Sequence, residues 1–182
     1  VKDSTVLFQD SMVPFYMNHL GRHGARFPTS GKALNKVKGM LIAAQQENRL
    51  TTAGVRLLST LQHLSEAFEG QWGNLSVVGE MEQQGIARRM MKHYSPLFSD
   101  SAKIEAIATY VPRCIHSMDV FLACMAQYNS SLRIQRNEGR QYNDILRFFF
   151  LNKPYVDYKE KGVWLPIYKD FVRKKIFPAP IM

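Results

Sequence analysis

A seven-residue stretch near the start of the 182-residue chain constrains its fold and function more than any other feature. The stretch reads RHGARFP at residues 22–28 and follows a mostly apolar run at residues 13–20. Such a run is typical of a strand that is buried on both faces of a parallel sheet. We therefore predict a strand over residues 13–20, with the loop of residues 21–28 at its carboxyl end, where ligands bind in open α/β sheets.

The residue types in this stretch suit the transfer of a phosphoryl group. The guanidinium groups of Arg22 and Arg26 can hold a tetrahedral oxyanion and neutralise the charge on its equatorial oxygens. Between them, His23 is a competent neutral nucleophile, since the unperturbed pKa of histidine is about 6.5. Each residue alone would more often be an ordinary surface or loop group, so the prediction of a phosphate site depends on their occurring together.

A second anion-binding position is predicted later in the chain. Residues 103–111 are typical of a parallel strand, and Pro112 suits the first turn of the helix that follows. Arg113 then lies at a strand-to-helix junction, where free backbone N–H groups and a guanidinium favour an anion. Arg113 is therefore a candidate for a third phosphate ligand, although a lone arginine more often lies on the surface. A further short strand is predicted over residues 132–135.

Helical periodicity is present before and after these strands. Apolar residues recur at three- and four-residue steps from Leu34 to Ala44, and two more helices are predicted to begin after the hydroxyl residues Thr51 and Ser76, each placed as an N-cap. The predicted buried stripes of these two helices are Leu57, Leu61, Leu64 and Phe68, then Val78, Met81, Gly85, Ile86, Met90 and Tyr94. The helix after Pro112 is apolar on more than one face, so we expect it to be central.

The two cysteines give no sign of a disulfide framework or a metal site. Cys114 and Cys124 lie ten residues apart on different faces of one predicted helix, so we expect no bridge between them. We predict that both are small core residues. Neither has metal-ligating residues near it in the sequence. We expect no metal and no cofactor, because arginines take the place of a cation in neutralising phosphate.

The formal net charge of +9 at pH 7 implies an acidic partner. Nucleic acid, an anionic membrane or a small polyanion would each satisfy this charge. No run of Lys and Arg is long enough for a nucleic-acid-binding arm, and no stretch approaches the about eighteen apolar residues of a membrane span. Residues 1–4 are no signal peptide. We predict a small phosphorylated substrate, no nucleic acid and no membrane span, and we expect Arg88 and Arg89 on an exposed helix face.

The RHGARFP stretch resembles the signature of the histidine phosphatase superfamily, and its second arginine followed by Phe-Pro is similar to the acid phosphatase and phytase branch. Two later segments resemble further blocks of that branch: LSVVGE at 75–80 with GIARR at 85–89, and VPRCIHSM at 111–118. These blocks are most similar to those of the multiple inositol polyphosphate phosphatases. The resemblance extends from residue 15 to about residue 175.

The resemblance implies an α/β fold with a three-layer α/β/α core around a parallel sheet. Residues 1–139 would form the amino-terminal part of this core, and residues 140–182 would begin a helical cap region. Aromatic residues in the second part offer more apolar surface than its few elements can cover, so we expect association through residues 145–177. The family is largely secreted or periplasmic, and we expect the same location for this chain.

The resemblance also implies the reaction, which is hydrolysis of phosphomonoesters such as inositol polyphosphates or phytate through a phosphohistidine. His23 would be the nucleophile, and the phosphate ligands would be Arg22, Arg26 and Arg113. Thr29 and Ser30 follow the signature closely enough to contact substrate.

One block of the family pattern is missing. The branch places a second histidine beside an acidic proton donor, as His-Asp or His-Ala-Glu, and no other histidine of this chain is followed by such residues. Without a general acid the reaction slows on the order of a hundredfold to ten-thousandfold. Glu80 and Glu82 are weak candidates for the role. We therefore expect an incomplete domain, the amino-terminal part of a longer enzyme.

Two other functions stay open at this point. The absent acid favours a catalytically inactive phosphate-binding module, and the basic charge alone favours a nucleic-acid-binding domain. His116 and Asp119, three residues apart on the predicted helix, are placed so that they can pair, although a structural role is the commoner one for a helix histidine.

Overall fold

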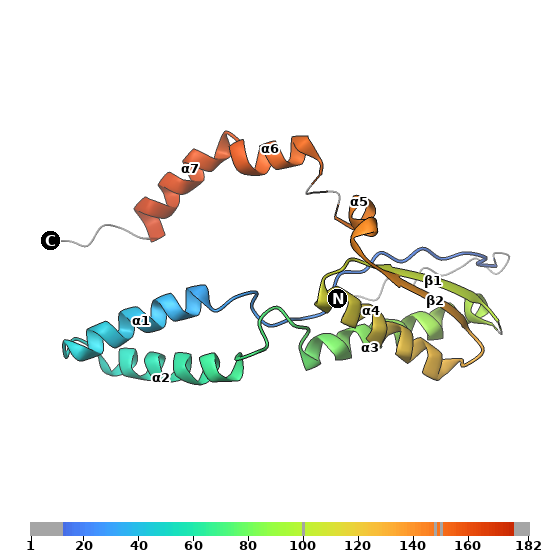
Figure 1. Cartoon of the computed structure of the whole chain (residues 1–182), viewed down its shortest axis with the longest axis horizontal. Coiled ribbons are helices and arrows are strands. Elements are labelled where there is room, and N and C mark those ends of the chain that lie inside the picture. The colour runs from blue at the N-terminus through green and yellow to red at the C-terminus, as the bar shows by residue number, and fades with distance from the viewer. Residues whose placement is uncertain (1–12, 100, 148, 150, 177–182) are drawn as a thin grey trace.

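The computed structural model describes residues 13–99, 101–147, 149 and 151–176. Seven α-helices and two strands are described in that part of the chain (Figure 1). In chain order they are α1 (Lys32–Gln46), α2 (Thr52–Ala67), α3 (Val77–His93), β1 (Lys103–Ala108), α4 (Pro112–Tyr128), β2 (Arg133–Glu138), α5 (Asn143–Leu146), α6 (Lys153–Lys161) and α7 (Trp164–Phe171).

The two strands form a parallel pair that runs in register from Lys103 opposite Arg133 to Ala108 opposite Glu138. Parallel strands need a crossover connection, and α4 supplies it as the helix between them. Two of the three predicted strands, those over residues 103–111 and 132–135, are confirmed as β1 and β2, and so is the helix that begins at Pro112. The fold class, α/β with a parallel sheet, is confirmed as well.

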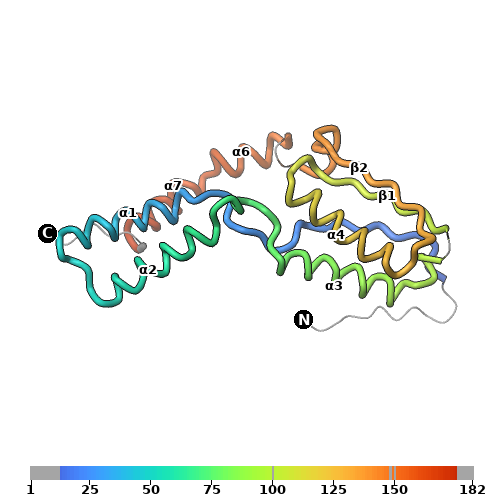
Figure 2. Tube along the Cα trace, turned by 60° about the horizontal axis from the view of Figure 1, so that its bottom comes forward, coloured from blue at the N-terminus to red at the C-terminus, as the bar shows by residue number. Residues whose placement is uncertain are grey.

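The core lies where α3 packs along α4 and α4 packs on β1. Its buried residues are Ala87 and Met91 of α3 and Cys124 and Met125 of α4. Ile104 of β1 is partly buried and packs against them. Figure 2 shows α3 and α4 running side by side. Cys114 and Cys124 are both free thiols, as expected, but only Cys124 is fully buried.

The buried face of α3 differs from the predicted stripe. Gly79, Gln83, Ala87 and Met91 are buried, whereas Met81 is 64% exposed and Val78 is also exposed. Two of these residues, Gly79 and Ala87, are small, and the close approach of Gly79 to the loop favours burial of this face. The prediction from hydrophobicity was therefore wrong by about one position around the helix.

Helices α1 and α2 form a hairpin that extends away from the α3–α4 unit (Figure 1). The Thr51 and Ser76 N-caps are confirmed, because their hydroxyl groups accept hydrogen bonds from Gly54 N and Gly79 N at 3.2 Å. The predicted buried stripe of α2 is wrong, since Leu57 and Leu64 are exposed and the buried residue is Leu58. Two helices that pack mainly on each other leave much of their apolar surface uncovered.

The predicted strand over residues 13–20 is absent. Phe15 is 95% exposed and Leu20 is 84% exposed, and among the described residues this segment pairs with no strand. An extended segment becomes a strand only when a neighbour satisfies its backbone N–H and C=O groups, and residues 13–20 do not join the open edge of β1 or of β2. The side chain of His19 nevertheless stacks on Phe121 of α4, with ring centroids 5.5 Å apart.

Helices α6 and α7 follow α5 in a separate arm (Figure 1). Apolar side chains along this part of the chain are exposed, and Val163 reaches 89%. Every helix in the described ranges falls short of what a bilayer crossing requires in length or apolar character.

Candidate active site

The loop of residues 22–28 lies against the start of α3, and backbone hydrogen bonds hold it there. Arg26 forms an isolated antiparallel bridge with Leu75. Phe27 N donates to Asn74 O at 3.0 Å, and Ser76 N donates to Ala25 O at 2.9 Å. The segment before α3 therefore positions the loop through main-chain hydrogen bonds.

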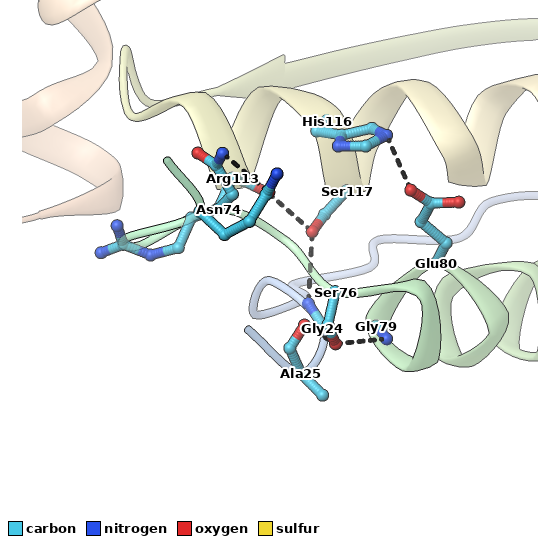
Figure 3. Close-up of polar contacts among 10 residues, drawn as sticks. Gly24, Ala25, Asn74, Ser76, Gly79, Glu80, Arg113, His116 and Ser117 are labelled. Atoms are coloured by element: carbon cyan, nitrogen blue, oxygen red, sulfur yellow. Dashed lines mark hydrogen bonds and ion pairs between the residues drawn. The ribbon is translucent and has the colours of Figure 1, made fainter. Parts of the chain in front are cut away.

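Two glycines allow the loop to touch α3 directly. A Cβ atom on Gly24 would lie 2.3 Å from the carbonyl oxygen of Gly79, and a Cβ atom on Gly79 would lie 2.1 Å from that of Ala25. Both distances are far shorter than any real contact of a Cβ atom. The glycine of the RHGARFP stretch and the glycine in the first turn of α3 are thus both required by this backbone-to-backbone contact (Figure 3).

A buried serine joins the loop to α4. The hydroxyl of Ser117 accepts from Gly24 N at 3.2 Å and donates to the carbonyl oxygen of Arg113 at 2.8 Å (Figure 3). Gln83 of α3 donates from Nε2 to the carbonyl oxygen of Arg22 at 3.1 Å. Sequence reasoning missed both residues, although a buried polar group on an otherwise apolar helix face is itself a sign that some backbone group needs a partner.

The imidazole of His23 is oriented by the loop itself. Its Nδ1 lies 2.8 Å from the carbonyl oxygen of Gly24. A carbonyl oxygen only accepts, so Nδ1 carries the proton and Nε2 keeps its lone pair. Burial lowers the pKa of His23, and the positive charges of Arg113, Arg22 and Arg26 lower it further, while the bond to Gly24 opposes them. The ring is therefore neutral near pH 7 and has a free nucleophilic nitrogen.

An open concavity of about 430 Å³ lies at this loop, lined by Arg22, His23, Gly24, Ala25 and Arg26. Arg113 is near enough to act on the charge of the His23 ring. Its buried Nε has no hydrogen-bond acceptor among the described residues. None of the ion pairs among the described residues includes Arg22, Arg26 or Arg113, so no carboxylate there neutralises these three guanidinium groups. Uncompensated guanidinium groups around one imidazole make a site for an anion.

The sequence profile of the histidine phosphatase superfamily (branch 2) matches residues 16–160, which is most of the chain. The chain belongs to the histidine phosphatase superfamily. A search of curated proteins found no match for it. Membership in this superfamily supports phosphatase activity in general.

The structure brings four of the predicted site residues together, which are His23, Arg22, Arg26 and Arg113. Thr29 and Ser30 are exposed and do not line the concavity, so their contact with substrate stays a prediction. Within the described ranges, no group of three His, Cys, Asp or Glu side chains is placed to hold a metal ion.

The two glutamates considered as proton donors do not line the concavity of this histidine phosphatase. Glu80 lies 3.3 Å from His116 Nε2, and Glu82 accepts a hydrogen bond from Ala25 N at 2.7 Å. His116 does not pair with Asp119, a pairing that the sequence left open beside the commoner structural role. Asp119 pairs instead with Arg136 of β2, since α4 turns His116 toward α3 and Asp119 toward the sheet.

Proposed function

We propose that this histidine phosphatase hydrolyses phosphomonoesters through a phosphohistidine at His23, and that its substrates are inositol polyphosphates. One observation supports the reaction more than any other. A neutral imidazole, protonated at Nδ1, sits among three guanidinium groups that no carboxylate neutralises in the described part of the chain. This arrangement fits a nucleophile that attacks a bound phosphate.

The proposed reaction has two steps. The guanidinium groups of Arg22, Arg26 and Arg113 hold the non-bridging oxygens while Nε2 of His23 attacks phosphorus in line with the ester oxygen. A bond forms between Nε2 and phosphorus, the bond from phosphorus to the ester oxygen breaks, and the leaving oxygen takes up a proton from solvent to give the alcohol. Water then attacks phosphorus and loses a proton to solvent, the bond to Nε2 breaks, and inorganic phosphate is released with His23 restored.

The substrate class rests on two further observations. The formal net charge of +9 favours a substrate that carries several negative charges. The segments at residues 75–80 and 111–118 resemble those of multiple inositol polyphosphate phosphatases, and the second contains Arg113. An open concavity also gives a bulky, multiply phosphorylated ring access to the loop.

A second candidate function is a module that binds phosphate esters without turning them over. It is favoured by the absence of a carboxyl group from the lining of the concavity, because an alkyl leaving group needs a proton donor. The two functions differ in whether the bond between Nε2 and phosphorus forms.

Rapid mixing with p-nitrophenyl phosphate tests the proposal, because p-nitrophenolate leaves without a general acid. We expect a burst of p-nitrophenol equal to the amount of protein, together with an acid-labile phosphate on His23, and neither in a His23→Ala variant. Phytate should bind and compete with the aryl ester. Binding of both compounds without a burst would contradict the hydrolase and favour the binding module.

A further inference from the structure

One peptide group joins a carboxylate to the nucleophile. Glu82 Oε2 accepts the backbone N–H of Ala25 at 2.7 Å, and the carbonyl oxygen of Gly24 accepts the Nδ1 proton of His23 at 2.8 Å. The N–H of Ala25 and the C=O of Gly24 are the two ends of the same planar peptide unit. Glu82 and His23 are therefore connected by a continuous chain of two hydrogen bonds across one conjugated group.

Ala25, whose N–H forms one end of this peptide, is held in place through its own carbonyl group. Ser76 donates to the carbonyl oxygen of Ala25 through both its backbone N–H and its hydroxyl, each at 2.9 Å. Gly79 packs against the same residue so closely that no Cβ atom would fit. Glu82 lies one turn after Gly79 on the same helix, so the packing that brings the loop to α3 also brings Ala25 N within reach of the carboxylate.

The charge of Glu82 affects how strongly Gly24 holds the imidazole. A bond to an ionised acceptor is shorter and stronger than a neutral one, and hydrogen bonds in a chain polarise one another. Negative charge at the N–H end of a conjugated peptide increases the electron density on its carbonyl oxygen. Gly24 thereby becomes a better acceptor for the Nδ1 proton, which leaves Nε2 as the nitrogen that attacks.

The other charged groups that face His23 act in the opposite direction. Arg22 and Arg26 from the loop and Arg113 from α4 all disfavour positive charge on the ring. As Nε2 bonds to phosphorus, the ring becomes more positive. A carboxylate that acts through the peptide compensates for this without lying in the concavity, where it would repel the phosphate.

We infer that Glu82 is a positioning residue, which acts on His23 through the Gly24–Ala25 peptide and fixes the protonation pattern of its ring. The inference rests on the proposed function, in which Nε2 is the nucleophile. It gives this glutamate a role other than that of a proton donor.

Three variants of the full chain separate this role from simple stabilisation. Glu82→Gln keeps an oxygen that can accept from Ala25 N but removes the charge, and Glu82→Ala removes both. Glu80→Gln is the matched control, because Glu80 lies on the same helix and pairs with His116 rather than with the loop. NMR of ¹⁵N-labelled histidine reads the tautomer and the titration of His23 directly, whether or not the protein is active.

We expect Glu82→Gln to shift the neutral ring toward the Nε2-protonated tautomer and to lower the pKa of His23 further. Formation of the phosphohistidine with p-nitrophenyl phosphate should slow by roughly threefold to tenfold, since a charged acceptor is replaced by a neutral one. Glu82→Ala should show a larger effect of the same sign, and Glu80→Gln should match the wild type.

A Glu82→Gln variant with unchanged tautomer, unchanged His23 titration and an unchanged burst rate would overturn the inference, whatever Glu82→Ala does. Equal changes in Glu80→Gln would overturn it too, because they would point to a general effect of charge on α3. Absence of a burst in the wild type would instead contradict the proposed function, while the NMR comparison would still test the connection between Glu82 and His23.

Discussion

Two regions of the molecule, the RHGARFP loop and the α1–α2 hairpin, are stabilised by different kinds of contact. The loop is fixed by a close backbone contact with α3, by hydrogen bonds that Ser76 and Gln83 donate to it, and by one that Ser117 accepts from it. The hairpin has one buried residue, Leu58, and the two helices pack on each other (Figure 1). The comparison shows that hydrogen bonds to the backbone of the loop hold the site in place. The site does not depend on a large apolar core for this.

The largest effect is expected from Arg113, which belongs to the closely fixed region although it lies far from the loop in the sequence. Replacing it with Ala removes one of the three proposed phosphate ligands, and loss of one such group should lower the rate of phosphoryl transfer by roughly a hundredfold to a thousandfold. Burst kinetics with p-nitrophenyl phosphate measure this loss. Arg88→Ala, on an exposed helix face, serves as the control and should keep the full rate.

The pH dependence of phosphorylation is the next sharpest test of the site. His23 reacts only when its ring is neutral, and burial together with the nearby arginines lowers its pKa. The rate should therefore be flat near neutral pH, where the ring is already neutral, and fall about tenfold per pH unit only below the lowered pKa. Single-turnover rates between pH 4 and pH 8 would measure this, and a loss of rate that begins above the ordinary histidine pKa would contradict the account.

Replacing a glycine with alanine in the loop, and then in the α1–α2 hairpin, tests how closely each region is packed. In Gly24→Ala the new methyl group would overlap the carbonyl oxygen of Gly79, so the loop and α3 must separate. We expect a loss of about 1–3 kcal/mol in the free energy of unfolding, with loss of the burst. Urea denaturation gives the free energy. A variant as stable and as active as the wild type would show that the contact is looser than the structure indicates.

The matching substitution in the hairpin should have the smallest effect and the opposite sign. A Cβ atom on Gly39 of α1 would meet no other atom within 4 Å. Alanine in a helix interior is about 0.5–1 kcal/mol more favourable than glycine, so Gly39→Ala should stabilise the hairpin slightly and leave the burst unchanged. Hydrogen exchange of the α1 amides measures the local effect. Destabilisation by Gly39→Ala would mean that α1 has a close neighbour.

Sequence reasoning was most successful where local chemistry decides the structure. The N-caps at Thr51 and Ser76, the strand that leads to Pro112 and the helix start beside Arg113 depend on residues within a few positions of one another. The convergence of Arg113 with the loop was predictable because Arg113 follows a strand directly. That position is typical of ligand-binding residues in open α/β sheets.

Sequence reasoning failed where contacts between residues far apart in the chain decide the structure. Whether residues 13–20 form a strand depends on which other segments pair with them, and the face of α3 that is buried depends on how closely Gly79 approaches the loop. The roles of Glu82 and Ser117 were missed for the same reason, since each bonds to a backbone N–H of the loop rather than to a side chain. No pattern in the sequence marks which main-chain group a distant side chain will meet.

The central claim is that Nε2 of His23 takes the phosphoryl group. It is tested most directly by ³¹P NMR of the protein denatured in alkali immediately after mixing with p-nitrophenyl phosphate, since phosphohistidine survives alkali. The account predicts one phosphohistidine resonance, at the position of the Nε2 isomer, that is absent from His23→Ala. A resonance of the Nδ1 isomer, or a phosphohistidine that persists in His23→Ala, would contradict it.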